Sequence, residues 1–110
     1  MKVSELASAL GLEIINMSDG DKIVKSGYAC DLLSWVIGRA EPESAFITIM
    51  SNLNVMAVAL LADSSCVILA EGVEIDDAVK NKAVSEGVNV LRTDKNTFEI
   101  SAMIYNLIKK

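Results

Sequence analysis

Three short apolar runs in the second half of the chain constrain the fold most. They are Ala45 to Met50, Cys66 to Ala70 and Val88 to Leu91, and each has the length of a strand. Between them lie a nearly all-apolar helical segment, Val55 to Ala62, and an amphipathic one, Asp76 to Glu86. Apolar strands that alternate with helices are typical of a parallel sheet covered by helices. The order therefore predicts an α/β fold with a mostly parallel sheet of four to five strands.

The first part of the chain predicts a helix followed by two extended segments. Val3 to Leu10 has the pattern of a short helix that Ser4 can cap. Glu13 to Met17 is a short strand, and Ile23 to Ala29 is a second extended segment interrupted at Gly27. These elements add to the strands of the second half and flank the same sheet.

Two further helices are expected, and the last of them, like the nearly all-apolar Val55 to Ala62 helix, carries more apolar surface than one sheet can cover. Asp31 is expected to be the N-cap of a largely buried helix that runs to about Arg39. The last helix, about Phe98 to Ile108, has two apolar stripes, the first made of Ile100, Met103, Ile104, Leu107 and Ile108 and the second of Phe98, Ala102 and Tyr105. One stripe can pack on the sheet and the other needs a different cover. We therefore expect a homodimer.

Composition limits the possible functions. The chain has 110 residues, enough for a single domain over residues 1–110. It has 10 basic and 15 acidic side chains and a net charge of −5, which argues against nucleic-acid binding. There is no histidine, so Ser-His or Cys-His catalysis and histidine-metal sites are excluded. We expect no metal, no cofactor and no catalytic residue.

Location follows from two further observations. The two cysteines, Cys30 and Cys66, are expected to be reduced and to pack as small buried apolar residues. The longest apolar run, Val55 to Ala62, is too short to cross a bilayer, and Ser4 and Glu5 interrupt the segment where a signal peptide would be apolar. A cytoplasmic protein without a membrane segment is the expectation.

Acidic residues are concentrated in the middle of the chain. From Asp31 to Asp77 there are eight acidic residues and one basic residue, Arg39, whereas six basic and three acidic residues follow Asp77. One interpretation is a set of solvated loops and helix N-termini, where acidic side chains are favourable. The other is an acidic face that meets a basic partner or the basic end of a second copy.

The loops after the predicted strands hold the first candidate site. Ligands of open parallel sheets gather at the carboxyl ends of the strands. There Ser51, Asn52 and Asn54 offer a hydroxyl, amides and helix N-terminal N–H groups to an anion, and Thr93 and Lys95 add a hydroxyl and a charge. The alternative is that Ser51 and Asn54 only cap the helix that follows. No glycine-rich phosphate-binding motif is present.

The second candidate site is the segment from Gly27 to Asp31. Gly27 would allow a close approach of a ligand to the backbone, and Tyr28 offers a ring and a hydroxyl. Asp31 can bind a ligand amine, or it can act only as a helix cap.

Two segments resemble a known family. DKIVKSGYACDLLSWV (Asp21 to Val36) and ITIMSNLNVMAVALL (Ile47 to Leu61) are similar to the DRTGG domain, and the resemblance extends from Val3 to Leu107. Its most specific parts are Gly27-Tyr28, Asp31 to Ser34, Thr48, Asn54 with Ala57 to Ala59, and Thr97-Phe98. This family also resembles the N-terminal domain of HPr kinase.

The resemblance implies an α/β fold and a regulatory or ligand-sensing role, with Thr48 among the candidate ligand-binding residues. The family has no established catalytic residues of its own. Some polar positions depart from the family pattern: Lys22 replaces an arginine, Lys25-Ser26-Gly27 replaces a threonine and glycine pair, and Met50 and Asn52 stand where glutamine and often histidine are usual.

Two functions from different classes remain open. The first is a non-catalytic, homodimeric regulatory module that senses a small anionic metabolite or a nucleotide. The second is an interaction subunit that docks onto a larger metabolic or redox enzyme or a kinase. An enzyme is the weakest reading, because no constellation of acid and base residues is evident.

Overall fold

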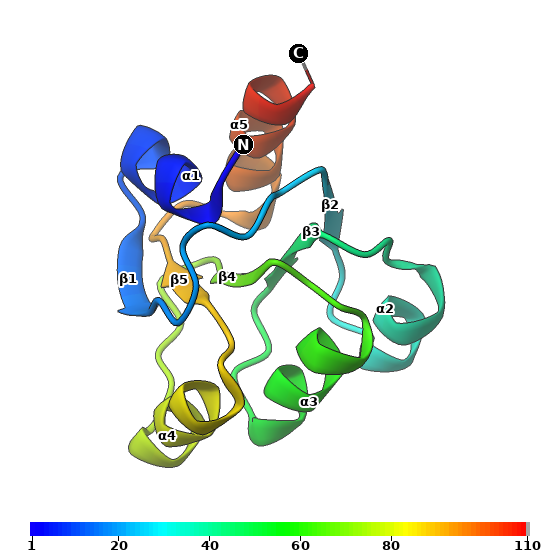
Figure 1. The fold of residues 1–110 in the computed structure, drawn as a ribbon, viewed down its shortest axis with the longest axis vertical. Coiled ribbons are helices and arrows are strands. Elements are labelled where there is room, and N and C mark those ends of the chain that lie inside the picture. The colour runs from blue at the N-terminus through cyan, green and yellow to red at the C-terminus, as the bar shows by residue number, and fades with distance from the viewer. Residues whose placement is uncertain (110) are drawn as a thin grey trace.

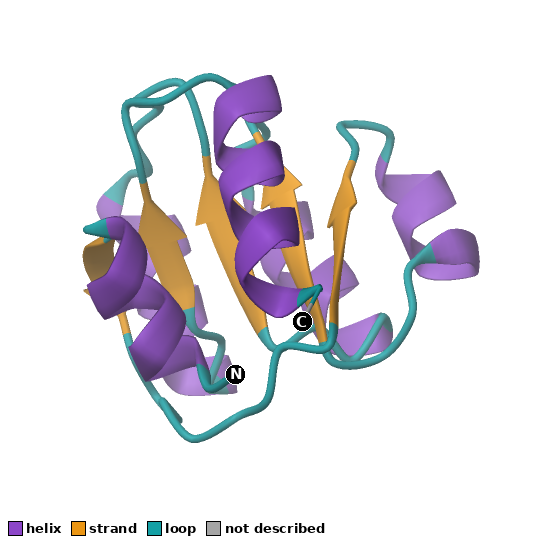
Figure 2. Ribbon diagram, turned by 90° about the horizontal axis from the view of Figure 1, so that it is seen from above, coloured by secondary structure: helices purple, strands orange, loops and turns teal. Residues whose placement is uncertain are grey.

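The five strands form one sheet in the order β1-β5-β4-β3-β2, as a computed structural model shows for residues 1–109. β2 (Ser26–Ala29), β3 (Ser44–Thr48), β4 (Cys66–Leu69) and β5 (Val90–Arg92) are parallel, and β1 (Glu13–Asn16) pairs antiparallel with β5. The four parallel strands point to the same edge of the sheet (Figure 2), which we call the carboxyl edge. The prediction of a mostly parallel sheet with four to five strands is confirmed.

Helices cover both faces of the sheet (Figure 1). α1 (Val3–Leu10) and α5 (Thr97–Ile108) lie on one face, and α2 (Leu33–Arg39), α3 (Leu53–Leu61) and α4 (Asp77–Glu86) lie on the other. Successive strand residues therefore enter different cores. Ile47 packs with α1 and α5 residues, whereas its neighbour Phe46 packs with residues of α2, α3 and α4. The strand–helix alternation predicted for the second half is confirmed.

The chain crosses the whole sheet between β1 and β2, which are its two outer strands. The crossing segment runs beneath the amino-terminal ends of the parallel strands (Figure 2). Asn89, buried just before β5, holds it: its side-chain NH₂ donates to the Asp19 carbonyl (2.7 Å) and the Ser65 carbonyl (3.0 Å). Its side-chain oxygen accepts from the Asp19 N–H (2.9 Å). The strand predicted from Val88 to Leu91 therefore begins two residues later, because Asn89 serves the crossing segment.

Three helix starts differ from the predicted caps. The N-cap of α1 is Lys2, whose N–H donates to the Glu5 carboxylate (2.8 Å), and Ser4 lies inside the helix. The N-cap of α3 is Asn52, which accepts from the N–H of Asn54 (3.0 Å), so neither Ser51 nor Asn54 is the cap. Asp31 is not the cap of α2 either, because that helix begins at Leu33 after Leu32.

The prediction that α2 is largely buried is wrong. Only Val36 of this helix is buried, while Trp35 and Ile37 are exposed. α2 lies at the end of its helical layer beside α3, so only one of its faces has a neighbour (Figure 1). The guanidinium of Arg39 lies 3.8 Å from the centre of the Trp35 ring and covers part of it.

Gly27 does not interrupt an extended segment. It lies inside β2, pairs with Ala45 of β3 and has no positive φ. The extended segment is shorter than predicted, because Ile23 makes only an isolated bridge to Lys2 and the strand begins at Ser26.

The last helix confirms the expectation of an uncovered stripe. Ile100 and Ile104 of the first stripe are buried against the sheet, whereas Phe98 of the second stripe is 83% exposed and Tyr105 is also exposed. Within residues 1–109, the structure has no helix with the length and apolar character needed to cross a membrane.

The two cysteines are free but differ in burial. Cys30 is half-buried, which departs from the expectation that both are buried, and Cys66 is buried in β4. Burial raises the pKa of the Cys66 thiol from 9.0 to about 12, and the charge of Lys22 opposes that rise. The native state therefore disfavours the Cys66 thiolate.

We expect the burial of Cys66 to protect its thiol from reagents and to make the stability of the fold fall at high pH. At pH 8 a thiol reagent should label Cys30 and reach Cys66 only when the chain unfolds. The stabilising contribution of protonated Cys66 is fully present below pH 9.0 and is lost as the pH rises toward about 12. Between these two values the Cys66 thiol ionises in the unfolded chain but stays protonated in the folded one. Urea unfolding at pH 8 and above pH 10 should show this loss in wild type and Cys30→Ala but not in Cys66→Ala. Equal loss in both variants would contradict the assignment.

Candidate functional site

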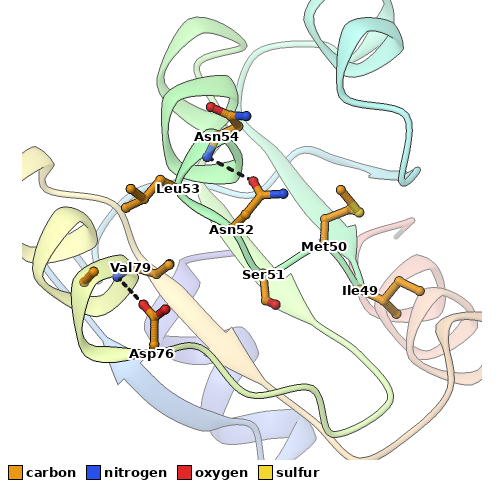
Figure 3. Close-up of a pocket in the computed structure, with 9 residues that line it drawn as sticks. Ile49, Met50, Ser51, Asn52, Leu53, Asn54, Asp76 and Val79 are labelled. Carbon is orange, nitrogen blue, oxygen red and sulfur yellow. Dashed lines mark hydrogen bonds between the residues drawn. The ribbon is translucent and has the colours of Figure 1, made fainter.

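An open pocket lies at the carboxyl edge, between the amino-terminal ends of α3 and α4 (Figure 3). Its volume is about 680 Å³, within the range usual for ligand pockets. Three predicted site residues line it together: Ser51, Asn52 and Asn54. Asp76, Ala78 and Val79 contribute from the start of α4. We call it the α3–α4 pocket.

Hydrogen bonds to Asp31 and Thr48 fix the loop after β3, which carries these polar residues. The Thr48 hydroxyl donates to the Asp31 carboxylate (2.8 Å), and the same carboxylate oxygen accepts from the Ile49 N–H (3.0 Å). Thr48 is fully buried and its hydroxyl also accepts from the Met50 N–H (3.1 Å). Asp31 and Thr48 thus position the loop after β3 and do not line the pocket.

The electrostatics of the α3–α4 pocket come from helix ends and amides. The N-termini of α3 and α4 both face it, and each gives partial positive charge to the pocket. None of its lining residues is a lysine or arginine, and Asp76 is the one charged side chain among them. The Asp76 carboxylate accepts from the Val79 N–H (3.0 Å), so it is engaged as the cap of α4. The pocket therefore suits a polar ligand bound through hydrogen bonds.

Thr93 and Lys95 lie in a different cavity from Ser51, Asn52 and Asn54. This cavity has a volume of about 260 Å³ and lies where β5 ends and β1 begins. Arg92, Glu13 and Asp94 also line it. The single anion site predicted from the loops is therefore two separate sites at the same edge, and we call the second one the Arg92 cavity.

Backbone hydrogen bonds tie the two loops between these sites together. The Glu71 N–H donates to the Lys95 carbonyl (2.8 Å) and the Gly72 N–H to the Thr93 carbonyl (2.9 Å). Gly72 has a φ of 67°, and a Cβ there would lie 2.8 Å from the Asp94 carboxylate. A glycine is thus needed where the β4–α4 loop meets the β5–α5 loop.

Gly27, Tyr28 and Asp31 do not form one site. Gly27 and Ala29 of β2 line an apolar groove with Phe98 and Tyr105 of α5, which we call the β2–α5 groove. Tyr28 points to the opposite core, where it packs with the α2–α4 layer. Neighbouring strand residues face opposite sides of a sheet, so a ligand in the groove at Gly27 does not reach the Tyr28 side chain.

Sequence reasoning missed Asp76 and Arg92. Asp76 has a readable signal, since it precedes an amphipathic helix, but its place in the same pocket as Asn54 depends on the pairing of β3 with β4. Arg92 ends the apolar run VNVLR, where a charged residue after a buried strand marks the carboxyl edge. Within residues 1–109 no group of three or more histidine, cysteine, aspartate or glutamate side chains is arranged to hold a metal ion.

Two comparisons with known proteins bear on this fold. The model of the DRTGG domain family matches residues 5–107. A solved structure with similar architecture is that of the CBS and DRTGG domains of the regulatory region of Clostridium perfringens pyrophosphatase, complexed with its activator diadenosine tetraphosphate. The TM-score is 0.72 at 14% sequence identity, and the match covers 94% of this chain.

The chain spans 45% of that pyrophosphatase fragment, so the likeness concerns a part of it. No curated protein matches the chain. The family match covers nearly all of the sequence, including the polar loop after β3 and the crossing segment before β2. The chain belongs to the DRTGG domain family.

Proposed function

We propose that this chain is a single-domain, non-catalytic regulatory module that binds a nucleotide or another small anionic metabolite in the α3–α4 pocket. The observation that carries the proposal is the convergence of two helix N-termini with Ser51, Asn52 and Asn54 around one open space. Helix N-termini favour anions, and amides and hydroxyls can recognise a base or a sugar. The activator bound by the pyrophosphatase regulatory region, a dinucleotide, gives the first ligand class to examine.

Two features favour binding over catalysis. The α3–α4 pocket contains a single titratable side chain, Asp76, and that carboxylate is already used by α4. Ser51 has no basic side chain among its pocket neighbours that would activate it as a nucleophile.

The two free thiols favour a reducing compartment such as the cytoplasm.

A thermal-shift series with diadenosine tetraphosphate, ATP, ADP and AMP tests the ligand class. At ten times the Kd, binding adds about 1.4 kcal/mol, which raises the melting temperature by roughly 5–10 °C. Asn54→Ala should weaken binding about tenfold because it removes a pocket amide whose side chain makes no hydrogen bond within residues 1–109. Asn106→Ala, an exposed asparagine of α5, is the matched control. An equal shift in both variants would place the ligand elsewhere.

The same proposal includes a homodimer. The outer edge of β2 pairs with no strand among the described residues, and the β2–α5 groove lies beside it with Phe98 and Tyr105 exposed. A second copy brings the same edge and the same aromatic residues to a two-fold axis, and two-fold dimers are the commonest homo-oligomers of soluble proteins.

An interaction subunit remains the second candidate, because α2 exposes a separate apolar surface. Trp35 and Ile37 of α2 and Leu32 just before it are all exposed, in the acidic part of the chain. If this surface docks onto a larger enzyme, Trp35→Ser should abolish co-purification of one defined partner from the native source. Such a loss, together with no nucleotide response, would favour the second candidate over the first.

A further inference from the structure

Arg92 has more hydrogen-bond donors than the described residues use. An arginine has five N–H donors in a planar fork. Nη2 donates to the Gly72 carbonyl at 3.2 Å, whereas Nε is buried and has no partner among residues 1–109. The side chain as a whole is 22% exposed and lines the Arg92 cavity. A buried N–H without a partner is costly, and the single hydrogen bond to Gly72 leaves most of the N–H donors of this guanidinium unused by residues 1–109.

The carboxylates nearest to the guanidinium do not satisfy it. Glu13 lies 3.7 Å from Nη1 and Glu74 lies 3.9 Å from Nη2, which are ion-pair distances and longer than hydrogen bonds. Both carboxylate side chains are largely exposed, so both are free to turn into solvent. Ion pairs of this kind contribute little to stability. A ligand oxygen at hydrogen-bond distance could therefore replace these two carboxylates with little loss of stability.

Two other groups make the cavity suitable for an anion. Lys95 supplies a second cation, and Thr93 supplies a hydroxyl whose oxygen accepts from the Lys95 N–H (3.3 Å), which leaves its hydrogen free to donate. Asp94 and Glu13 are the acidic residues that line the same cavity. Asp94 opposes an anion, and Glu13 competes with one for Arg92.

We propose that the Arg92 cavity binds the phosphate group of a small phosphorylated metabolite, through Arg92, Lys95 and Thr93. Arginine matches phosphate oxygens in a two-point geometry that lysine alone does not provide. A phosphate carries up to two negative charges, which corresponds to the two cations, whereas a carboxylate carries one. The incoming phosphate displaces Glu13 and Glu74 from the guanidinium.

This site is distinct from the α3–α4 pocket and does not depend on it. The α3–α4 pocket contains no cation among its lining residues, whereas the Arg92 cavity contains two. The two proposals can therefore fail separately. Asn54→Ala tests the first pocket and should leave the response to phosphate unchanged.

Phosphate titration with matched ionic strength tests the proposal. Inorganic phosphate is added to the full chain while sodium chloride is reduced to keep the ionic strength constant, and binding is followed by melting temperature and by amide chemical shifts. Wild type should show a saturable rise in melting temperature and shifts at residues 92–95. AMP and adenosine form two further arms, and AMP should act like phosphate while adenosine has no effect at this cavity.

Three variants decide between a site and a general salt effect. Arg92→Lys keeps the charge but loses the fork, so binding should weaken about tenfold. Glu13→Gln removes the competing carboxylate, so binding should tighten about threefold. Lys25→Met removes an exposed cation outside the cavity and should change nothing.

The proposal is overturned if phosphate acts equally on all four proteins, or if it has no effect up to about 50 mM, well above the millimolar Kd that corresponds to a few hydrogen bonds. If Arg92→Lys does not fold, Lys95→Met replaces it: this variant removes the second cation and should weaken phosphate binding, whereas Glu13→Gln should tighten it. Glu13 is exposed and Lys95 is half-buried, so neither substitution removes a buried core side chain.

Discussion

Phe98→Glu should convert the proposed dimer into a monomer while leaving the fold of each chain intact. Phe98 is 83% exposed in the single chain, so its substitution removes almost no packing within one copy. At a two-fold interface each copy contributes one Phe98, and a glutamate would bring a desolvated charge into an apolar contact. We expect the dissociation constant to rise by about 30-fold or more. Light scattering over a dilution series should then report 11.8 kDa instead of twice that mass.

Leu61→Glu is the matched control for this change. Leu61 is 72% exposed on α3, on the face of the sheet opposite to α5 (Figure 1). It adds the same charge to an exposed apolar position outside the β2–α5 groove, so the dimer should persist. If Leu61→Glu dissociates the dimer and Phe98→Glu does not, the second copy binds to the other face.

Asn89→Leu should destabilise the fold strongly although the side chains are similar in size. Asn89 is 1% exposed and makes three hydrogen bonds, two to Asp19 and one to Ser65. Leucine would leave these three groups without their partner at the start of β5. Since a buried unsatisfied group costs about 1–3 kcal/mol, we expect a loss of roughly 2–4 kcal/mol in the free energy of unfolding.

Urea denaturation measures this loss, and Asn106→Leu on the exposed face of α5 serves as the control, with an expected change within about 0.5 kcal/mol. Hydrogen exchange adds a local test. The amide of Asp19 should lose protection in Asn89→Leu, because its acceptor is the Asn89 side chain. A loss below 1 kcal/mol with Asp19 still protected would show that the crossing segment is held by other contacts.

The sequence predicts the sheet well where strands are apolar on both faces. The alternating elements from β3 onward follow from local pattern alone, because each strand is short, apolar and followed by a helix. β2 is harder to predict, since Gly27 and Ser26 weaken its pattern and it forms only through pairing with β3. α2 has a buried-helix composition but lies at the end of its layer, and position in the fold is not encoded in the periodicity of one helix.

The candidate site is predicted only in part, because the sequence does not show which strands are neighbours in the sheet. Ser51, Asn52 and Asn54 lie close together because they are close in the chain. Thr93 and Lys95 also follow a strand of the parallel sheet, so the sequence predicts them at the same edge, but β4 lies between β3 and β5 and keeps the two loops apart. Asp31 has the features of a helix cap in the sequence, yet its carboxylate binds Thr48 and Ile49 across the sheet edge. Contacts of this kind depend on which strands are neighbours.

A residue-resolved titration tests most directly the claim that this DRTGG domain works by binding a small ligand at its carboxyl edge. Diadenosine tetraphosphate and ADP are added to the ¹⁵N-labelled chain, and amide shifts are followed by nuclear magnetic resonance. We predict saturable shifts at residues 51–54 and 78–79, which line the α3–α4 pocket, and an about tenfold higher Kd from the same shifts in Asn54→Ala. Spectra that remain unchanged at millimolar ligand, or shifts confined to the β2–α5 groove, would contradict it.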